Sequence, residues 1–191
     1  MARWQPGATQ RLVVAAVDLF TEQGYDATTV AQIAERAGVT KSTFFRHFSD
    51  KRELLVAGQE TLSRLLADGI AEAPAGATAL EAVSVGLERA SEAMGPTNRE
   101  LGPRIQAAVA ASTELQERDA LKSVGMAAAM TEALAARGFP DATAHLAGEL
   151  GVMAFKRGFS RWSESDKNTA GLASFSLDAL KELRSATMTL G

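Results

Sequence analysis

The side chains that catalysis usually needs are scarce in this 191-residue sequence. It has no cysteine and only two histidines, His47 and His145, so a thiol nucleophile, a disulfide and a thiolate metal site are excluded. No glycine-rich phosphate loop, H-E-x-x-H pair or G-x-S-x-G segment occurs. The carboxylates of Glu114 and Glu117 have the ordinary spacing of a helix surface. We therefore expect no enzyme, no metal and no cofactor; catalysis through His145 is the alternative.

A different kind of chemistry is available in the short segment from Thr40 to Phe48. If this segment is a helix, Phe44 and Phe48 share one face at i and i+4 and can anchor it on the rest of the domain. A helix of this kind enters the major groove of DNA by its N-terminal end. The residues left on or near the outer face are Lys41, Ser42, Thr43, Phe45 and Arg46.

The neighbouring residues have the signals needed to position that helix. Thr29 and Gln32 form a Thr-x-x-Gln capping box that opens a preceding helix. Gly38 can adopt the left-handed conformation that ends it, and Thr40 can cap the next helix. Two short helices joined by a tight turn with glycine predict a helix-turn-helix over residues 29–48.

Apolar residues recur with helical spacing along nearly the whole chain, and no convincing strand pattern occurs. We expect an all-α fold of about nine helices, with a three-helix N-terminal helix-turn-helix domain and a C-terminal helical body. Glycine and proline breaks predict a fourth helix from Asp50 to about Ala71, a kinked or restarted helix at Gly102-Pro103, and a ninth helix from Asp166. The break at residues 74–77 predicts a domain boundary, with the C-terminal body over residues 78–191.

Charge and hydropathy favour a soluble protein that contacts DNA through its N-terminal part. Residues 1–52 carry a net charge of +2 and the remainder −5, giving −3 overall; a difference of this size also arises by chance. No apolar run approaches the ~18 residues of a membrane span, and the N-terminus lacks the apolar stretch of a signal peptide. We expect a cytoplasmic protein with no membrane partner.

The stretch from about Pro6 to Leu66, a third of the chain, resembles the DNA-binding domain of TetR-family transcriptional regulators. The matching residues are Ala16-Val17-Asp18-Leu19-Phe20, Gly24-Tyr25, Thr28-Thr29-Val30, Ile33-Ala34, Ala37-Gly38-Val39, His47-Phe48 and Lys51-Arg52-Glu53-Leu54-Leu55. One position departs from the family pattern, because Phe45 stands where a tyrosine usually reaches phosphate.

The resemblance assigns roles to individual residues. It implies that Thr29, His47 and Lys51 contact the phosphate backbone and that Lys41, Ser42 and Thr43 face bases or phosphates. Phe45 can pack on a sugar or a thymine methyl, or fold back onto the domain. Arg3 and Arg11 are candidates for backbone contacts from the N-terminal arm. The predicted DNA-binding residues are Thr29, Thr40, Lys41, Ser42, Thr43, Phe45, Arg46, His47 and Lys51.

The body resembles the family's ligand-binding and dimerising domain in layout, and faintly the type that binds acyl-CoA-like ligands. A methionine-rich pocket would suit a hydrophobic effector, although each of these residues is also a candidate for plain core. The predicted pocket residues are Met94, Met126, Met130, His145, Met153 and Trp162. The residues predicted to form a homodimer interface are Leu146, Leu150, Met153, Phe175, Leu180 and Leu183.

These features together predict a dimeric repressor that binds double-stranded DNA at a palindromic operator. A small hydrophobic or acyl-CoA-like effector would release it. Two alternatives stay open: a helix-turn-helix regulator without an effector, and a helical protein-interaction module whose helix-turn-helix is only structural.

Overall fold

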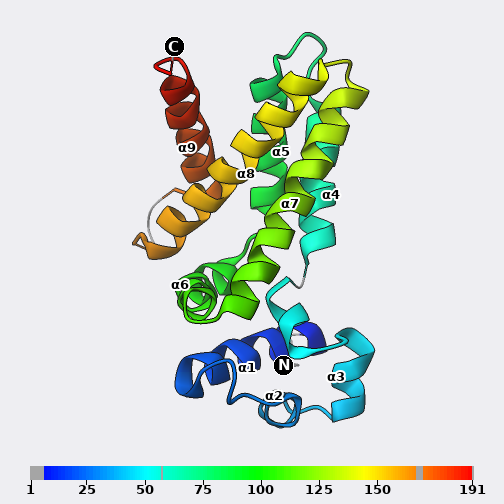
Figure 1. Cartoon of the computed structure of the whole chain (residues 1–191), viewed down its shortest axis with the longest axis vertical. Helices are drawn as coiled ribbons and strands as arrows, with labels where there is room; N and C mark the ends of the chain where they lie inside the picture. The colour runs from blue at the N-terminus through cyan, green and yellow to red at the C-terminus, as the bar shows by residue number, and fades with distance from the viewer. Residues whose placement is uncertain (1–6, 57, 167–169, 191) are drawn as a thin grey trace, which may run out of the picture. The chain divides into compact units, whose positions relative to one another are not determined.

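The computed structural model describes residues 7–56, 58–166 and 170–190, and this part of the chain is helical without any strand. The predicted all-α class is confirmed. No helix in the described ranges is long and apolar enough to cross a membrane. The helices are α1 Ala8–Gln23, α2 Val30–Arg36, α3 Lys41–His47, the 3₁₀ helix η1 Lys51–Val56, α4 Gln59–Glu72, α5 Ala79–Glu92, α6 Pro96–Ala110, α7 Thr113–Ala136, α8 Asp141–Glu164 and α9 Leu172–Thr187 (Figure 1).

The described residues divide into two compact units. The first holds those before Ala57 together with Arg104–Ala120, and the second holds Gly58–Pro103 with those from Leu121 onward. The sequence instead suggested domains of 6–66 and 78–191. The difference has a packing reason, because Leu66 of α4 is buried in the core of the second unit, whereas Leu115 of α7 is buried in the core of the first.

The fourth predicted helix is broken, so the prediction of one helix from Asp50 to Ala71 was wrong. Gly58 has a φ of +81°, a left-handed conformation that glycine adopts at little cost. The chain therefore forms η1 first and starts α4 only at Gln59. One other boundary differs, because α9 begins at Leu172. Pro103 lies inside a single α6, so the helix does not restart there.

The helix-turn-helix forms as its caps predict. The Thr29 hydroxyl accepts from the Gln32 backbone N–H at 3.3 Å, and the Gln32 side chain accepts from the Thr29 backbone N–H at 2.9 Å. Gly38 follows α2 with a φ of +66°, and the Thr40 hydroxyl accepts from Thr43 N–H at 3.0 Å to cap α3. Each cap satisfies a backbone donor that has no partner within its helix.

The predicted phenylalanine anchor of α3 is also confirmed. Phe44 is completely buried and Phe48 nearly so, with 5.7 Å between their ring centroids. They lie in one cluster with Leu12 and Ala16 of α1 and Ile33 of α2. The orientation of α3 within the first unit is therefore set by its buried face.

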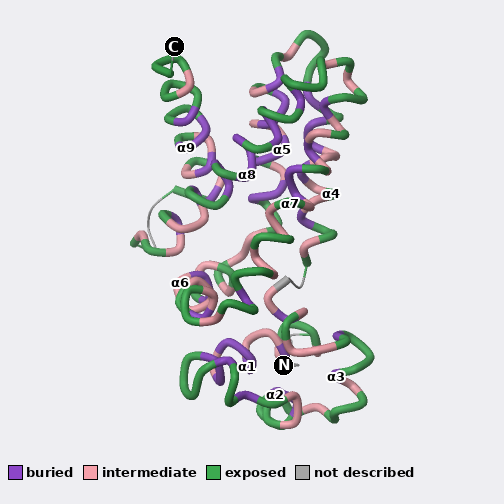
Figure 2. The backbone as a smooth tube through the Cα atoms, viewed as in Figure 1, coloured by how far each residue is buried: buried purple, intermediate pink, exposed green. Residues whose placement is uncertain are grey.

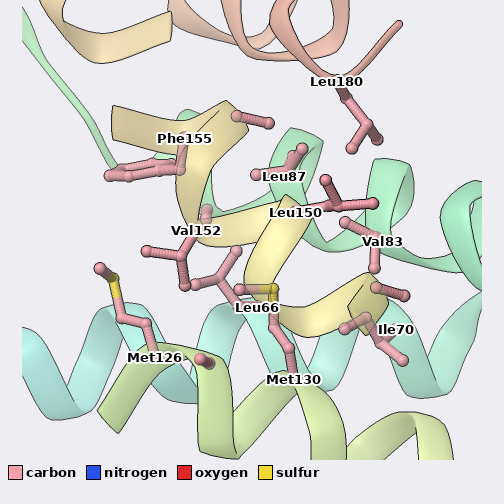
Figure 3. Close-up of a cluster of buried hydrophobic side chains, with 14 of the residues drawn as sticks. Leu66, Ile70, Val83, Leu87, Met126, Met130, Leu150, Val152, Phe155 and Leu180 are labelled. Carbon is pink, nitrogen blue, oxygen red and sulfur yellow. The ribbon is translucent and has the colours of Figure 1, made fainter. Parts of the chain in front are cut away.

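Close helix packing builds the core of the second unit. The backbones of α4 and α5 approach so closely that a Cβ on Gly69 would lie 2.7 Å from Gly86 Cα. A Cβ on Gly151 of α8 would similarly meet the Met130 sulfur at 2.8 Å. Figure 3 shows Met130 of α7 among Leu66 and Ile70 of α4, and Figure 2 shows buried positions on the same helices.

Candidate nucleic-acid interface

The outer face of α3 combines exposed cations with an exposed aromatic ring. Lys41, Ser42 and Arg46 are exposed, and Phe45 keeps 57% of its surface open to solvent. Thr43 is half-buried, with its hydroxyl oxygen 3.0 Å from that of Thr40. No acidic residue lies between Glu35 and Asp50, so this face is positively charged.

The two cations of α3 have no partner within the described residues. Neither Lys41 nor Arg46 makes a hydrogen bond or ion pair with any residue in the described ranges. By contrast, Arg36 makes two 2.8 Å contacts with Glu22 and holds the pKa of that carboxyl below its ordinary value. Lys41 and Arg46 are thus the cations of this helix that can engage an anion without breaking an internal contact.

His47 and Arg11 connect α1 to the helix-turn-helix. The Nδ1 of His47 lies 3.4 Å from the Thr9 hydroxyl, and its side chain is exposed. Arg11 Nε donates to the Ala37 carbonyl at 3.1 Å, directly beside the turn. Arg11 therefore supports the turn, and Arg3 lies outside the described residues.

Lys51 has internal partners that the sequence did not predict. Its ammonium donates to the carbonyls of Tyr25 at 2.7 Å and Thr28 at 3.0 Å, and lies 4.0 Å from the centroid of the Tyr25 ring. An ammonium has three donors, so a phosphate could use only the one that these carbonyls leave. The phosphate contact of Lys51 stays a prediction, while its contact with the segment before α2 is a structural fact.

Thr29 is similarly engaged in its own helix. Its hydroxyl lies 2.9 Å from the Gln32 side-chain oxygen and donates to it, besides accepting from the Gln32 backbone. Its predicted phosphate contact, also untested, would have to compete with that bond.

A buried tyrosine and two carboxylates hold η1 in place, and sequence analysis missed this group. Arg52 pairs with Asp50 at 2.5 Å and with Glu114 of α7 at 3.3 Å, and it holds the pKa of Asp50 below its ordinary value. Tyr25 is 5% exposed, and burial, then the Glu114 carboxylate, raise its pKa. No sequence signal links residues 25, 52 and 114, because only the fold brings them together.

Residues 12–57 match the family model described as "Bacterial regulatory proteins, tetR family". Over these residues the chain is similar to the N-terminal domain of tetR-family regulators. The HTH-type transcriptional regulator TcmR of Streptomyces glaucescens is 38% identical over 87 residues, covering 41% of this chain and 38% of TcmR. The HTH-type transcriptional activator FasR of Mycolicibacterium smegmatis is 38% identical over 63 residues, covering 33% and 29%. The chain thus spans well under half of these relatives.

Solved structures extend the likeness of fold beyond the tetR-family domain. A candidate TetR-family regulator from Syntrophomonas wolfei matches with a TM-score of 0.64 at 16% identity, covering 96% of each chain. FadR of Bacillus subtilis, solved in complex with stearoyl-CoA, matches with a TM-score of 0.57 at 18% identity, covering 91% of this chain and 96% of FadR. These likenesses show that the second unit also has the fold of such regulators.

The structure divides the six predicted pocket residues between the second core and the surface. Met126, Met130 and Trp162 are buried in the second core and Met94 is packed against it, which is the plain-core interpretation. His145 and Met153 are instead exposed on α8. Methionine content alone cannot distinguish a pocket lining from a filled core.

The predicted dimer residues also separate into two groups. Leu150, Leu180 and Leu183 are buried within the chain's own core, so they are not available to a second subunit. Leu146 and Met153 of α8 are exposed by 57% and 44%. Phe175 is half-buried and lines a shallow groove along α8 and α9 with Arg161, Asp178, Lys181, Glu182 and Ser185.

Proposed function

We propose that this chain is a sequence-specific transcriptional regulator of the tetR family, which binds duplex DNA in the cytoplasm through α3. The observation that carries the proposal is the outer face of the capped and anchored helix α3. Its cations Lys41 and Arg46 have no partner among the residues that the structure describes. A helix in the major groove reads bases by side-chain donors and acceptors. Lys41, Ser42 and Thr43 would contact bases or phosphates, with Arg46 and His47 beside them, while Thr40 sets the start of the helix.

Selection of tight-binding duplexes from a random pool tests this function. With the selected duplex, Lys41→Ala combined with Thr43→Ala lowers affinity by about 10- to 100-fold, the loss expected for base contacts worth 1–3 kcal/mol. Arg64→Ala is the matched control, because it removes an exposed cation of α4, outside the proposed interface. Full affinity and sequence preference in the double variant would contradict the assigned surface. Weak binding with little salt dependence by the unaltered chain would favour the protein-interaction alternative.

We further propose that two copies bind a palindromic operator as a homodimer. The exposed Leu146 and Met153 of α8 support a contact with a second subunit, since apolar side chains at helical spacing gain stability when covered. A C₂ dimer presents two α3 helices to successive major grooves about 34–36 Å apart. An operator whose inverted half-sites have this spacing is therefore the expected target.

The third part of the proposal is release of the operator by a small hydrophobic or acyl-CoA-like effector, which makes the chain a repressor. The support is the shared fold with FadR, which was solved with stearoyl-CoA. Arg104 and Arg161 are not free for the phosphates of CoA, because they pair with Asp18 and Glu182. A long-chain acyl-CoA should raise the Tm of the chain and weaken its binding to the operator. If neither the Tm nor the operator affinity changes, the chain is a regulator without this effector.

A further inference from the structure

The ring of Phe45 is the one large apolar side chain exposed on α3 within the described residues. It follows Lys41 by four positions and Ser42 by three, so helical spacing places it beside both on the outer face. Its inner side is supported by Phe44, whose buried ring meets it edge-to-face with 5.4 Å between centroids. Phe45 therefore does not fold back into the core, and 57% of its surface is open to solvent.

The chemistry of this ring restricts what it can contact in DNA. A phenyl group has no hydrogen-bond donor, so it cannot bond to phosphate oxygens or to base heteroatoms. In the major groove, the apolar group that a base pair presents is the C5-methyl of thymine. Lys41 and Arg46 on the same helix, which pair with no other described residue, favour the approach of a polyanion. DNA is therefore the occupant that matches this surface in charge.

We propose that Phe45 is a specificity-determining residue that contacts the C5-methyl group of a pyrimidine in each operator half-site. This inference rests on the proposed function, and it adds a base preference to it. Covering a methyl group with the ring removes apolar surface from water on both partners, which gives the preference its physical cause. A 5-methylcytosine presents the same methyl group and would be accepted in the same way.

The test replaces the thymines of the selected operator by deoxyuridine, one symmetric pair at a time, using the full chain. This change removes only the methyl group. At one pair we expect affinity to fall about 4-fold per half-site, the value of one buried methylene-sized group. In Phe45→Ala the same replacement changes affinity less than about 2-fold. Arg64→Ala, outside the proposed interface, keeps the sensitivity of the unaltered chain.

A second arm asks whether the methyl group itself is recognised. With cytosine at the sensitive position, 5-methylation should tighten binding by the unaltered chain and not by Phe45→Ala. Two results would overturn the proposal: no thymine whose replacement weakens binding, or a methyl effect that survives in Phe45→Ala. Failure of the proposed function is a different result, because then no duplex is selected at all. Circular dichroism and Tm of Phe45→Ala should match those of the unaltered chain, since the ring is exposed.

Discussion

At the scale of single residues, Lys51 is a cation whose contacts lie within the chain. Its ammonium holds the carbonyls of Tyr25 and Thr28, which lie in the segment just before α2. The family resemblance assigned Lys51 to the phosphate backbone of DNA. It could not predict the partners, because backbone carbonyls have no sequence signature and lie 23 and 26 residues away.

Replacing Lys51 by methionine should destabilise the chain. The change keeps the length of the side chain but leaves the two carbonyls without their donor, and we expect a loss of about 1–3 kcal/mol in the free energy of unfolding. Urea denaturation measures it. Lys41→Met is the matched control, and its stability should stay within about 0.5 kcal/mol of the unaltered chain, as for an ordinary surface site. Unchanged stability with weaker DNA binding in Lys51→Met would instead support the phosphate role.

At the scale of helices, the caps were predictable and the interruptions were less so. Thr29 with Gln32 is readable because a capping box needs only residues three apart. The break at Gly58 was missed because the apolar pattern of residues 54–66 continues across it. The placement of α3 followed from Phe44 and Phe48, but the pairing of Arg52 with Glu114 depends on a contact across 62 residues of chain.

The two capping boxes give a paired test of helix stability. Thr29→Ala and Thr78→Ala each remove a side-chain cap, at α2 and α5, and each should cost about 1 kcal/mol in the free energy of unfolding. Thr29→Ser and Thr78→Ser should restore most of the loss, since serine caps equally well. Thermal or urea unfolding measures both pairs. Equal stability of the alanine and serine variants would show that these caps do not stabilise the fold.

Acid should weaken the second cap through Glu81. The Thr78 backbone N–H, followed by the Thr78 hydroxyl, donates to this carboxylate and lowers its pKa from 4.5. Because the folded chain favours the ionised form, this contribution to stability is complete above pH 4.5 and is lost as the pH falls below it. The stability difference between the unaltered chain and Glu81→Gln should therefore shrink between pH 6 and pH 3. A difference that is constant with pH would contradict this interpretation.

At the scale of the whole molecule, the division into units depends on long-range packing that the sequence does not display. Residues 104–120 join the first unit through Ala108 and Leu115, far along the chain from the helices they meet. The apolar stripes of α8 and α9 do not reveal from sequence which side chains pack inside the chain and which stay exposed, as Leu146 and Met153 do. The core of the second unit buries Leu150, Leu180 and Leu183 against other helices of the same chain.

The proposed subunit interface can be separated from the core by two kinds of substitution. Leu146→Glu with Met153→Glu should convert a dimer into a folded monomer, because charges replace the exposed apolar side chains of α8. Leu180→Ala should instead cost about 2–5 kcal/mol of stability through a cavity. Sedimentation and urea unfolding distinguish these outcomes. Leu121→Glu, on the exposed side of α7, is the control; dissociation by that change alone would move the interface to α7.

The central claim, that the outer face of α3 binds DNA, is tested most directly by the salt dependence of operator affinity. Lys41→Ala with Arg46→Ala removes the two unpartnered cations without touching a buried contact. We predict weaker binding and a shallower fall of log affinity with log salt than for the unaltered chain, because fewer counterions are released. Arg64→Ala should leave both values nearly unchanged. The same affinity and the same slope in the double variant would contradict the account.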